Sequence, residues 1–213
     1  MFQYFSGSIQ LVDVARISMC ILTAVASSGC SKTAAPTLAA RPGFVMPAAG
    51  ASTDTLLRIG DSFPKLQAVD LDGNAVTLDK QLLGDRYTLI VFWSTWCGFC
   101  MLELPHEVEL AKQYERFGLR VIGVNADETS AIAKASAREY DIPWLNLFEG
   151  PDRTISNELG IKQWPALLLL DSDGKVVITS PELRSISAET LPDGSDRQID
   201  GLEWALRELL ENK

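Results

Sequence analysis

The chain has 213 residues, of which 46% are hydrophobic and 22% charged, an ordinary composition for one globular domain with additional segments. Its formal net charge at neutral pH is −9, which argues against nucleic acid as a partner and against a basic patch for membranes. Of four cysteines, Cys20 and Cys30 lie in a segment whose composition suits export. The remaining pair is too few for a disulfide-rich scaffold.

Residues 1–30 have the pattern of a secretory signal. Arg16 ends a polar stretch, and the apolar run 17–26 that follows is too short for a membrane span, which needs about 20 residues. Small residues then lead to Cys30 in a pattern that resembles a bacterial lipobox, with Ser27 in place of the usual aliphatic residue. We therefore expect export to an oxidising compartment, with a lipid attached at Cys30. Ordinary cleavage and an uncleaved anchor are the alternatives.

Residues 31–58 are rich in Ala, Pro, Ser, Thr and Gly without periodicity, which predicts a flexible tether. We expect one folded domain over residues 59–213. It opens with two alternating runs, 66–71 and 75–78, which are separated by the turn sequence Asp-Gly-Asn at 72–74. This arrangement predicts a β-hairpin.

The sequence Trp96-Cys97-Gly98-Phe99-Cys100 follows an apolar run over 87–93, which predicts a buried strand, and opens a helical pattern over 98–117. A strand therefore delivers two cysteines to the first turn of a helix, where the dipole and the N–H groups stabilise a thiolate. The i, i+3 spacing lets the second sulfur reach the first. These residues favour redox chemistry, in which Cys97 attacks a foreign disulfide and Cys100 resolves the mixed disulfide.

Half of a zinc site and a structural disulfide are the other interpretations of such a pair. No second C-x-x-C and no pair of histidines exists to complete a zinc site, and haem attachment would need His where Met101 stands. His106, the only histidine, lies about 120° around the helix from Cys100, which disfavours a copper site. Without a G-x-G-x-x-G fingerprint, electrons must come from another protein.

The rest of the chain alternates strand and helix patterns. We expect a buried strand at 119–125, a helix at 129–140, a short strand at 144–148, a short helix at 154–159, a strand from Pro165 to 170, an edge strand at 175–179 and a final amphipathic helix at 199–210. For the helix at 129–140 we expect an apolar face formed by Ala131, Ile132, Ala135 and Tyr140. No role is predicted for the Ser-, Pro- and charge-rich insertion at 181–198.

The segment 92–105, with its Trp-Cys-Gly-Phe-Cys sequence, resembles the active-site segment of the thioredoxin superfamily. More narrowly, it is similar to the TlpA/ResA-like group, membrane-anchored thiol-disulfide oxidoreductases of the bacterial cell envelope. The resemblance runs from about Ile59 to the C-terminus and is weakest in the last third. It implies a thioredoxin-like three-layer α/β sandwich: a mixed sheet with helices on both faces and an N-terminal β-hairpin.

The resemblance also implies roles for particular residues. Pro165 takes the place of a cis-proline that faces the C-x-x-C, and Trp164 the place of a residue that contacts the substrate backbone, although Trp164 could instead be a core aromatic. Glu103 takes the place of an acidic residue that handles the proton of the buried cysteine; a solvated first-turn glutamate is the alternative. Phe99 stands where proline is commonest, which leaves the direction of electron flow open, and Trp96 could face the substrate.

The sequence thus predicts thiol-disulfide exchange in the bacterial cell envelope or periplasm, with no metal and no cofactor besides the Cys97–Cys100 disulfide. By resemblance, the protein keeps client cysteines reduced, as in cytochrome c maturation, and takes electrons from a membrane or periplasmic donor protein. One alternative is a metal-binding or client-binding lipoprotein that uses the cysteines as ligands. Another is a thiol peroxidase, although related peroxiredoxins carry Thr three residues before the cysteine, where this chain has Ser94.

Overall fold

The computed structural model describes residues 57–180, 182–184, 186–190 and 196–211. The predicted export segment, Cys30 and nearly all of the predicted tether lie outside these residues. Among the described residues, none of the helices is long and apolar enough to cross a membrane.

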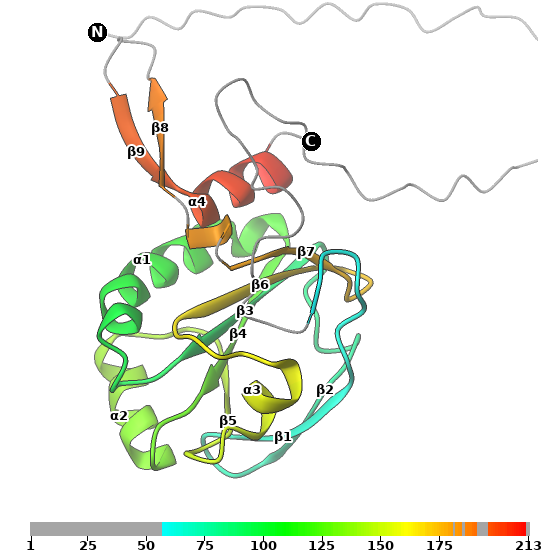
Figure 1. The fold of residues 1–213 in the computed structure, drawn as a ribbon, viewed down its shortest axis with the longest axis vertical. Coiled ribbons are helices and arrows are strands. Elements are labelled where there is room, and N and C mark those ends of the chain that lie inside the picture. Colours follow the sequence, from blue (N-terminus) through cyan, green and yellow to red (C-terminus); the bar gives the residue numbers. More distant parts are fainter. Residues whose placement is uncertain (1–56, 181, 185, 191–195, 212–213) are drawn as a thin grey trace, which may run out of the picture. The chain divides into compact units, whose positions relative to one another are not determined.

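The domain is built on one mixed sheet of seven strands in the order β2-β1-β5-β4-β3-β6-β7 (Figure 1). Strands β3, β4 and β5 are parallel, and every other neighbouring pair is antiparallel. The strands are β1 (Leu66–Asp70), β2 (Ala75–Leu78), β3 (Tyr87–Trp93), β4 (Leu119–Asn125), β5 (Leu145–Phe148), β6 (Ala166–Asp171) and β7 (Val176–Thr179). The predicted hairpin is therefore confirmed as β1–β2, and β7 is an edge strand as expected.

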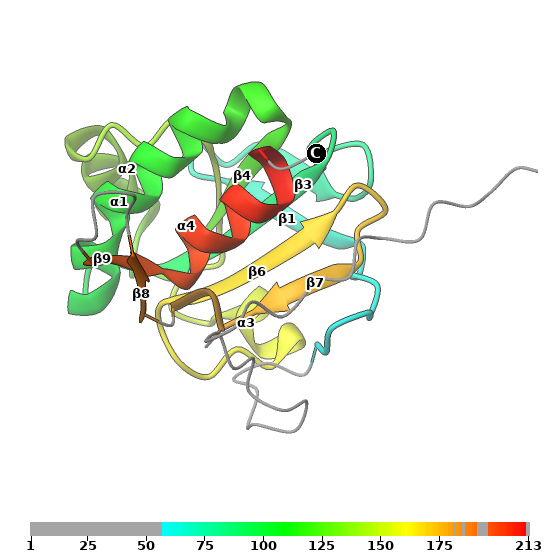
Figure 2. The ribbon, with the colours of Figure 1, turned by 90° about the horizontal axis from the view of Figure 1, so that it is seen from above.

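Helices cover both faces of this sheet (Figure 2). The helices are α1 (Gly98–Tyr114), α2 (Ser130–Glu139), α3 (Thr154–Leu159) and α4 (Gly201–Leu206). One core cluster joins side chains of α1 and α4 to one face of the sheet, and a second joins α3 to the other face. Because β3-α1-β4 and β4-α2-β5 step in the same direction across the sheet, right-handed crossovers put α2 on the face of α1. The domain is thus the three-layer thioredoxin-like sandwich that the sequence predicts.

Strand β3 is central because its sequence is apolar on both faces. All seven residues of β3 are buried, as a strand between two covered faces requires. It pairs in parallel with β4 and antiparallel with β6, and Phe92 lies opposite Ala166. The end of β3, where the chain leaves for Cys97, therefore lies beside the start of β6, where Pro165 stands.

The segment after β7 forms structure that the sequence did not predict. A 3₁₀ turn (Glu182–Arg184) is followed by β8 (Ile186–Thr190) and β9 (Asp196–Asp200), which pair as an antiparallel ribbon (Figure 1). The final helix begins after Asp200, whose side chain caps it, and not at Ile199 as predicted. Leu202, Leu206, Leu209 and Leu210 are buried, as the amphipathic pattern indicated.

The apolar face predicted for α2 is wrong except for Tyr140, which is partly buried and packs against the core cluster of α1 and α4. Ile132 is 42% exposed, and Ala131 and Ala135 are also exposed, whereas Ala133 and Ser136 are buried. The limits of the helix are close to the prediction, because the side chain of Thr129 accepts the N–H of Ile132 as an N-cap.

Candidate active site

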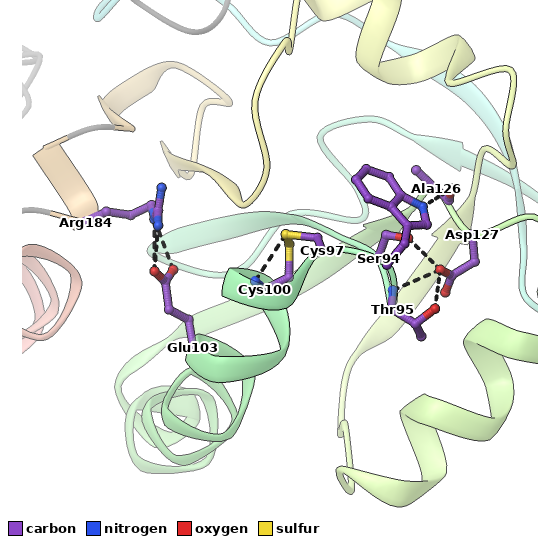
Figure 3. Close-up of a disulfide and its surroundings, with 9 residues drawn as sticks. Ser94, Thr95, Cys97, Cys100, Glu103, Ala126, Asp127 and Arg184 are labelled. Carbon is purple, nitrogen blue, oxygen red and sulfur yellow. Dashed lines mark hydrogen bonds and ion pairs between the residues drawn. A yellow bond between two sulfur atoms is a disulfide. The ribbon is translucent and has the colours of Figure 1, made fainter.

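Cys97 and Cys100 form a disulfide at the N-terminus of α1, with their Cα atoms 5.2 Å apart (Figure 3). Cys97 is the N-cap residue of the helix, and its sulfur accepts the backbone N–H of Cys100 at 3.2 Å. When the bond opens, this N–H and the positive end of the helix are placed to stabilise a thiolate on Cys97. Cys97 is 7% exposed and Cys100 2%, so the first cysteine is the less buried residue of the two.

Asp127 holds the loop that leads from β3 to the disulfide. One of its carboxylate oxygens accepts three hydrogen bonds: from the Ser94 hydroxyl (2.5 Å), the Thr95 N–H (2.9 Å) and the Thr95 hydroxyl (2.7 Å) (Figure 3). The other accepts the side-chain amide of Asn125 at 2.9 Å. The sequence analysis missed Asp127, although a polar residue just after a strand next to β3 was a usable signal.

Trp93 and Trp96, which lie at the two ends of the segment that leads from β3 to Cys97, differ in their exposure to solvent. Trp93 is fully buried and donates its indole N–H to Asn146 Oδ1 at 2.9 Å. Gly123 makes room for this bond, since a Cβ atom there would collide with the Asn146 amide. Trp96 is 49% exposed, and its indole N–H reaches the Ala126 carbonyl at 3.2 Å. The ring of Trp96, the residue before Cys97, is therefore partly exposed, and the hydrogen bond of its N–H to Ala126 holds it in place.

The Trp164–Pro165 peptide bond is cis, as the resemblance implied. The Trp164 ring lies 5.7 Å from the Trp96 ring, centroid to centroid, so the two predicted substrate-binding indoles come together beside the disulfide. Trp164 is half-buried and packs against both core clusters, which gives it a share in the core as well as an accessible part. Phe99 is 68% exposed between the two cysteines.

Arg153 joins this pair of indoles from the start of α3. Its guanidinium carbon lies 4.9 Å from the centroid of Trp96 and 4.8 Å from that of Trp164, within cation–π range of both rings. Its backbone is in the left-handed region, with φ of 52°. The sequence analysis missed Arg153, because nothing in its local sequence signals contact with residues that stand 57 and 11 positions away.

Glu103 is paired and not free in solvent, although 35% of its side chain is exposed. Both of its carboxylate oxygens bind Arg184, with N–O distances of 2.7, 3.0 and 3.2 Å. The carboxylate points toward Arg184 and not toward the sulfurs (Figure 3). Arg184 belongs to the insertion for which the sequence predicted no role, so this segment reaches the helix that carries the disulfide.

A second carboxyl group lies one helical turn beyond Glu103. Glu107 is 4% exposed and borders a cavity of about 230 Å³ together with Glu103, His106, Leu167, Leu183, Arg184, Asp200 and Leu202. Burial, and next the charge of Glu103, raise the pKa of Glu107 to about 8, because burial penalises the ionised form. Glu107 is therefore largely protonated at neutral pH.

His106 closes the same cavity by pairing with Asp200, with 2.5 Å between Nε2 and Oδ2. This hydrogen bond raises the pKa of His106 against the opposing effect of burial. His106 thus ties α1 to the cap of α4 and stands apart from the cysteines. Among the described residues, no cluster of three or more His, Cys, Asp or Glu side chains could hold a metal ion.

Comparisons with known proteins agree with this geometry. The model of the AhpC/TSA family matches residues 59–179. A thiol-disulfide oxidoreductase ResA of Bacillus cereus is 32% identical over 121 residues, which are 57% of this chain and 68% of that protein. The thiol:disulfide interchange protein DsbE of Pseudomonas aeruginosa is 29% identical over 116 residues, 54% of this chain and 62% of its own length.

A solved structure extends the likeness to three dimensions. The solution structure of a thiol:disulfide interchange protein from Bacteroides sp. has a TM-score of 0.58 and 24% identity, and the match covers 73% of this chain and 91% of that one. This likeness bears on the fold alone. The family model covers the strand, the bonded cysteine pair and the cis-proline, and the ResA relative is 32% identical; this chain therefore belongs to the AhpC/TSA family and is a thiol-disulfide oxidoreductase of thioredoxin-like fold.

Proposed function

We propose that this oxidoreductase acts outside the cytoplasm, where it reduces disulfides of client proteins through Cys97 and Cys100. The observation that carries the proposal is the position of Cys97 as the N-cap of α1, with the Cys100 N–H directed at its sulfur. This position favours a thiolate on Cys97, and the thiolate is the attacking species in disulfide exchange.

In the proposed reaction, the Cys97 thiolate attacks one sulfur of a client disulfide. The client S–S bond breaks, a Cys97–client disulfide forms, and the released client thiolate takes up a proton. Cys100 then loses its proton and attacks the Cys97 sulfur, and the second client thiolate leaves and is protonated. Two electrons and two protons have passed to the client, and the Cys97–Cys100 disulfide remains. A donor protein with a dithiol must reduce it again, and no other cofactor is required.

The surrounding residues would position the client. Pro165, with its cis peptide bond, and Trp164 stand at the start of β6, beside the end of the strand that leads to Cys97. Trp96 and Phe99 are exposed on either side of Cys97 and offer apolar contact. We assign these side chains to client binding. We assign Glu103 to the proton of Cys100, a role that requires its carboxylate to leave Arg184 and turn toward the sulfur.

The proposed location rests on the sequence. The signal-like segment that ends at Cys30, and the compositionally simple tether after it, support export and attachment to the membrane by a lipid. Apocytochrome c and the other thiol proteins of the cell envelope are the client class that the resemblance suggests.

Insulin reduction in the presence of dithiothreitol tests the proposed activity. The full chain should speed precipitation of the insulin B chain over dithiothreitol alone, and Cys97→Ser should abolish the increase. A rate equal to that of dithiothreitol alone would overturn the reductase proposal. A zinc or copper titration, and a peroxide-consumption assay, run on the same sample, would separate the metal-binding and peroxidase alternatives.

A further inference from the structure

We propose that Arg153 makes the surface around the disulfide selective for client segments that carry a carboxylate close to the reacting cysteine. The inference rests on the proposed client-reducing function and names a feature of the clients. It assigns Arg153 as a specificity-determining residue, while bond exchange stays with Cys97 and Cys100.

Arg153 lies beside both indoles of the site. The guanidinium of Arg153 lies 4.9 Å from the ring centroid of Trp96 and 4.8 Å from that of Trp164. Trp96 directly precedes Cys97, and Trp164 directly precedes the cis peptide bond at Pro165. Because the residues that directly precede Cys97 and Pro165 both contact this cation, we expect a client segment bound at Cys97 to come near Arg153.

The guanidinium of Arg153 is also without a polar partner among the described residues. Over residues 57–180 and the shorter described segments after them, the Arg153 guanidinium has no hydrogen-bond acceptor and no ion-pair partner. Its contacts are with the two aromatic rings, so the N–H groups along its edge have no acceptor in the described part of the chain and remain for a ligand. A planar guanidinium binds a carboxylate with two parallel hydrogen bonds, so a carboxylate is the group that this edge fits best.

Glu149, the acidic side chain whose pKa responds to the charge of Arg153, does not bind the guanidinium. Burial raises the pKa of Glu149, and the charge of Arg153 is a smaller opposing effect. The Glu149 carboxylate, however, accepts the N–H of Ser156 at 2.7 Å and its hydroxyl at 2.5 Å, and it is buried beneath the start of α3. Glu149 therefore holds the turn that carries Arg153, and the guanidinium stays available on the side of the indoles.

Arg153 also differs in chemistry from the exposed side chains around the disulfide. Trp96, Phe99 and Leu102, close to the disulfide in sequence, are 49%, 68% and 77% exposed. Exposed apolar side chains accept many apolar partners and discriminate little among them. The chain as a whole carries a net charge of −9, which repels acidic partners at long range. A fixed cation beside the disulfide supplies a local attraction that sorts clients by charge near the cysteine.

Three synthetic peptides with one internal disulfide, which carry Glu, Gln or Lys next to the first cysteine and are otherwise identical, test the proposal. The full chain is reduced, freed of excess reductant and mixed with each oxidised peptide, and the second-order rate of electron transfer is measured by acid quenching and mass spectrometry. We expect the Glu peptide to react about threefold faster than the Gln peptide and about tenfold faster than the Lys peptide at low salt. At about 1 M salt the three rates should converge, because the Debye length falls to about 3 Å.

Variants separate recognition from packing. Arg153→Gln should bring the three rates to within about twofold of one another, and Arg153→Lys, which keeps the charge without the planar fork, should retain part of the preference. Arg138→Gln removes the same charge from the exposed end of α2 and should leave both the rates and the preference unchanged. Circular dichroism and a urea midpoint establish that each variant is folded.

Two results would overturn the selectivity: wild-type protein that treats the three peptides alike, or Arg153→Gln that slows all three by the same factor. The second result would make Arg153 a packing residue for the indoles. Failure of wild-type protein to reduce any of the peptides, or insulin, would instead refute the reductase function itself, and the selectivity with it.

Discussion

The guanidinium of Arg184 binds both carboxylate oxygens of Glu103 across 81 positions of sequence and so fastens the segment after β7 to the helix that carries the disulfide. The two side chains are 31% and 35% exposed. A guanidinium that binds both oxygens of one carboxylate fixes the geometry more tightly than a single N–O contact does. Because both side chains are partly exposed, solvent still screens the attraction between their charges.

We therefore predict that Glu103 and Arg184 are coupled in stability. In a double-mutant cycle with Glu103→Gln and Arg184→Gln, the coupling in the free energy of unfolding should be about 1 kcal/mol at low salt. Urea denaturation of the four proteins measures it. Lys80 and Asp173 form a matched control pair at 3.5 Å, with both side chains more than 70% exposed, and should show almost no coupling. Equal coupling in the two cycles would contradict the prediction.

The second prediction concerns Glu107, whose pKa is raised from 4.5 to about 8 by burial and by the charge of Glu103. His106, Arg184 and Asp200 are the other charged groups that act on it. The unfolded chain ionises this group above about pH 4.5, while the folded chain keeps it neutral to about pH 8. Its contribution to stability is therefore fully present below pH 4.5 and is lost as the pH rises toward 8, where the loss is on the order of a few kcal/mol.

Glu107→Gln should remove this dependence, because an amide does not ionise. The variant should gain stability relative to wild type as the pH rises, and urea midpoints at about pH 5, 7 and 9 would measure the gain. Glu109→Gln, on the exposed side of the same helix, is the control and should give nearly pH-independent differences. Parallel stability curves for Glu107→Gln and wild type would show that the prediction is wrong.

The third prediction is an asymmetry between the two cysteines. Cys97 is the N-cap and the less buried cysteine, at 7% exposed against 2%, so attack on a client should begin there. Cys97→Ser should be inactive and trap nothing, whereas Cys100→Ser should accumulate covalent client complexes that dissolve with reductant. Non-reducing gels of envelope extracts from the two variants measure this. Complexes on Cys97→Ser alone would reverse the assignment.

The fourth prediction concerns Trp164, which contacts both Trp96 and Arg153. Trp164→Thr should change the choice of client, since it removes one of the two rings that contact the Arg153 guanidinium. The ratio of the rates for the Glu and Lys peptides should fall severalfold, and the free energy of unfolding by about 1–2 kcal/mol. Phe99→Ala, which removes an exposed ring without touching Arg153, should slow all peptides and leave that ratio intact. If Trp164→Thr reduces every peptide at the wild-type rate, the indole serves only packing.

The fifth prediction concerns Cys30, which lies outside the described residues. If a lipid is attached there, Cys30→Ala should release the protein from membranes or block its processing. Partitioning into the detergent phase of a Triton extract measures attachment, and Cys20→Ala, in the apolar run of the same segment, is the control that should still partition with detergent. Unchanged partitioning of Cys30→Ala would refute lipid attachment at this residue.

The sequence alone was enough to predict the strands, turns and helix ends that depend on residues close together in the chain. The apolar run 87–93 is β3, the Asp-Gly-Asn turn joins β1 to β2, and Gly118 ends the first helical segment with φ of 90°. The i, i+3 spacing was enough to place Cys97 and Cys100 together at a helix start. These features are local, because alternation, helical spacing and the special backbones of glycine and proline act over a few residues.

Which distant side chains meet depends instead on the tertiary fold. Arg184 reaches Glu103 because the 3₁₀ turn that carries it follows edge strand β7 and contacts α4, and Arg153 meets Trp96 and Trp164 because β3 and β6 lie side by side where the site forms. Ile132 of α2 is exposed for a related reason. Helical spacing predicts which residues share a face, but only the packing of the helix decides which face is buried. A side chain's partner across the fold is set by crossovers and sheet order, which leave no trace in the residues next to it in sequence.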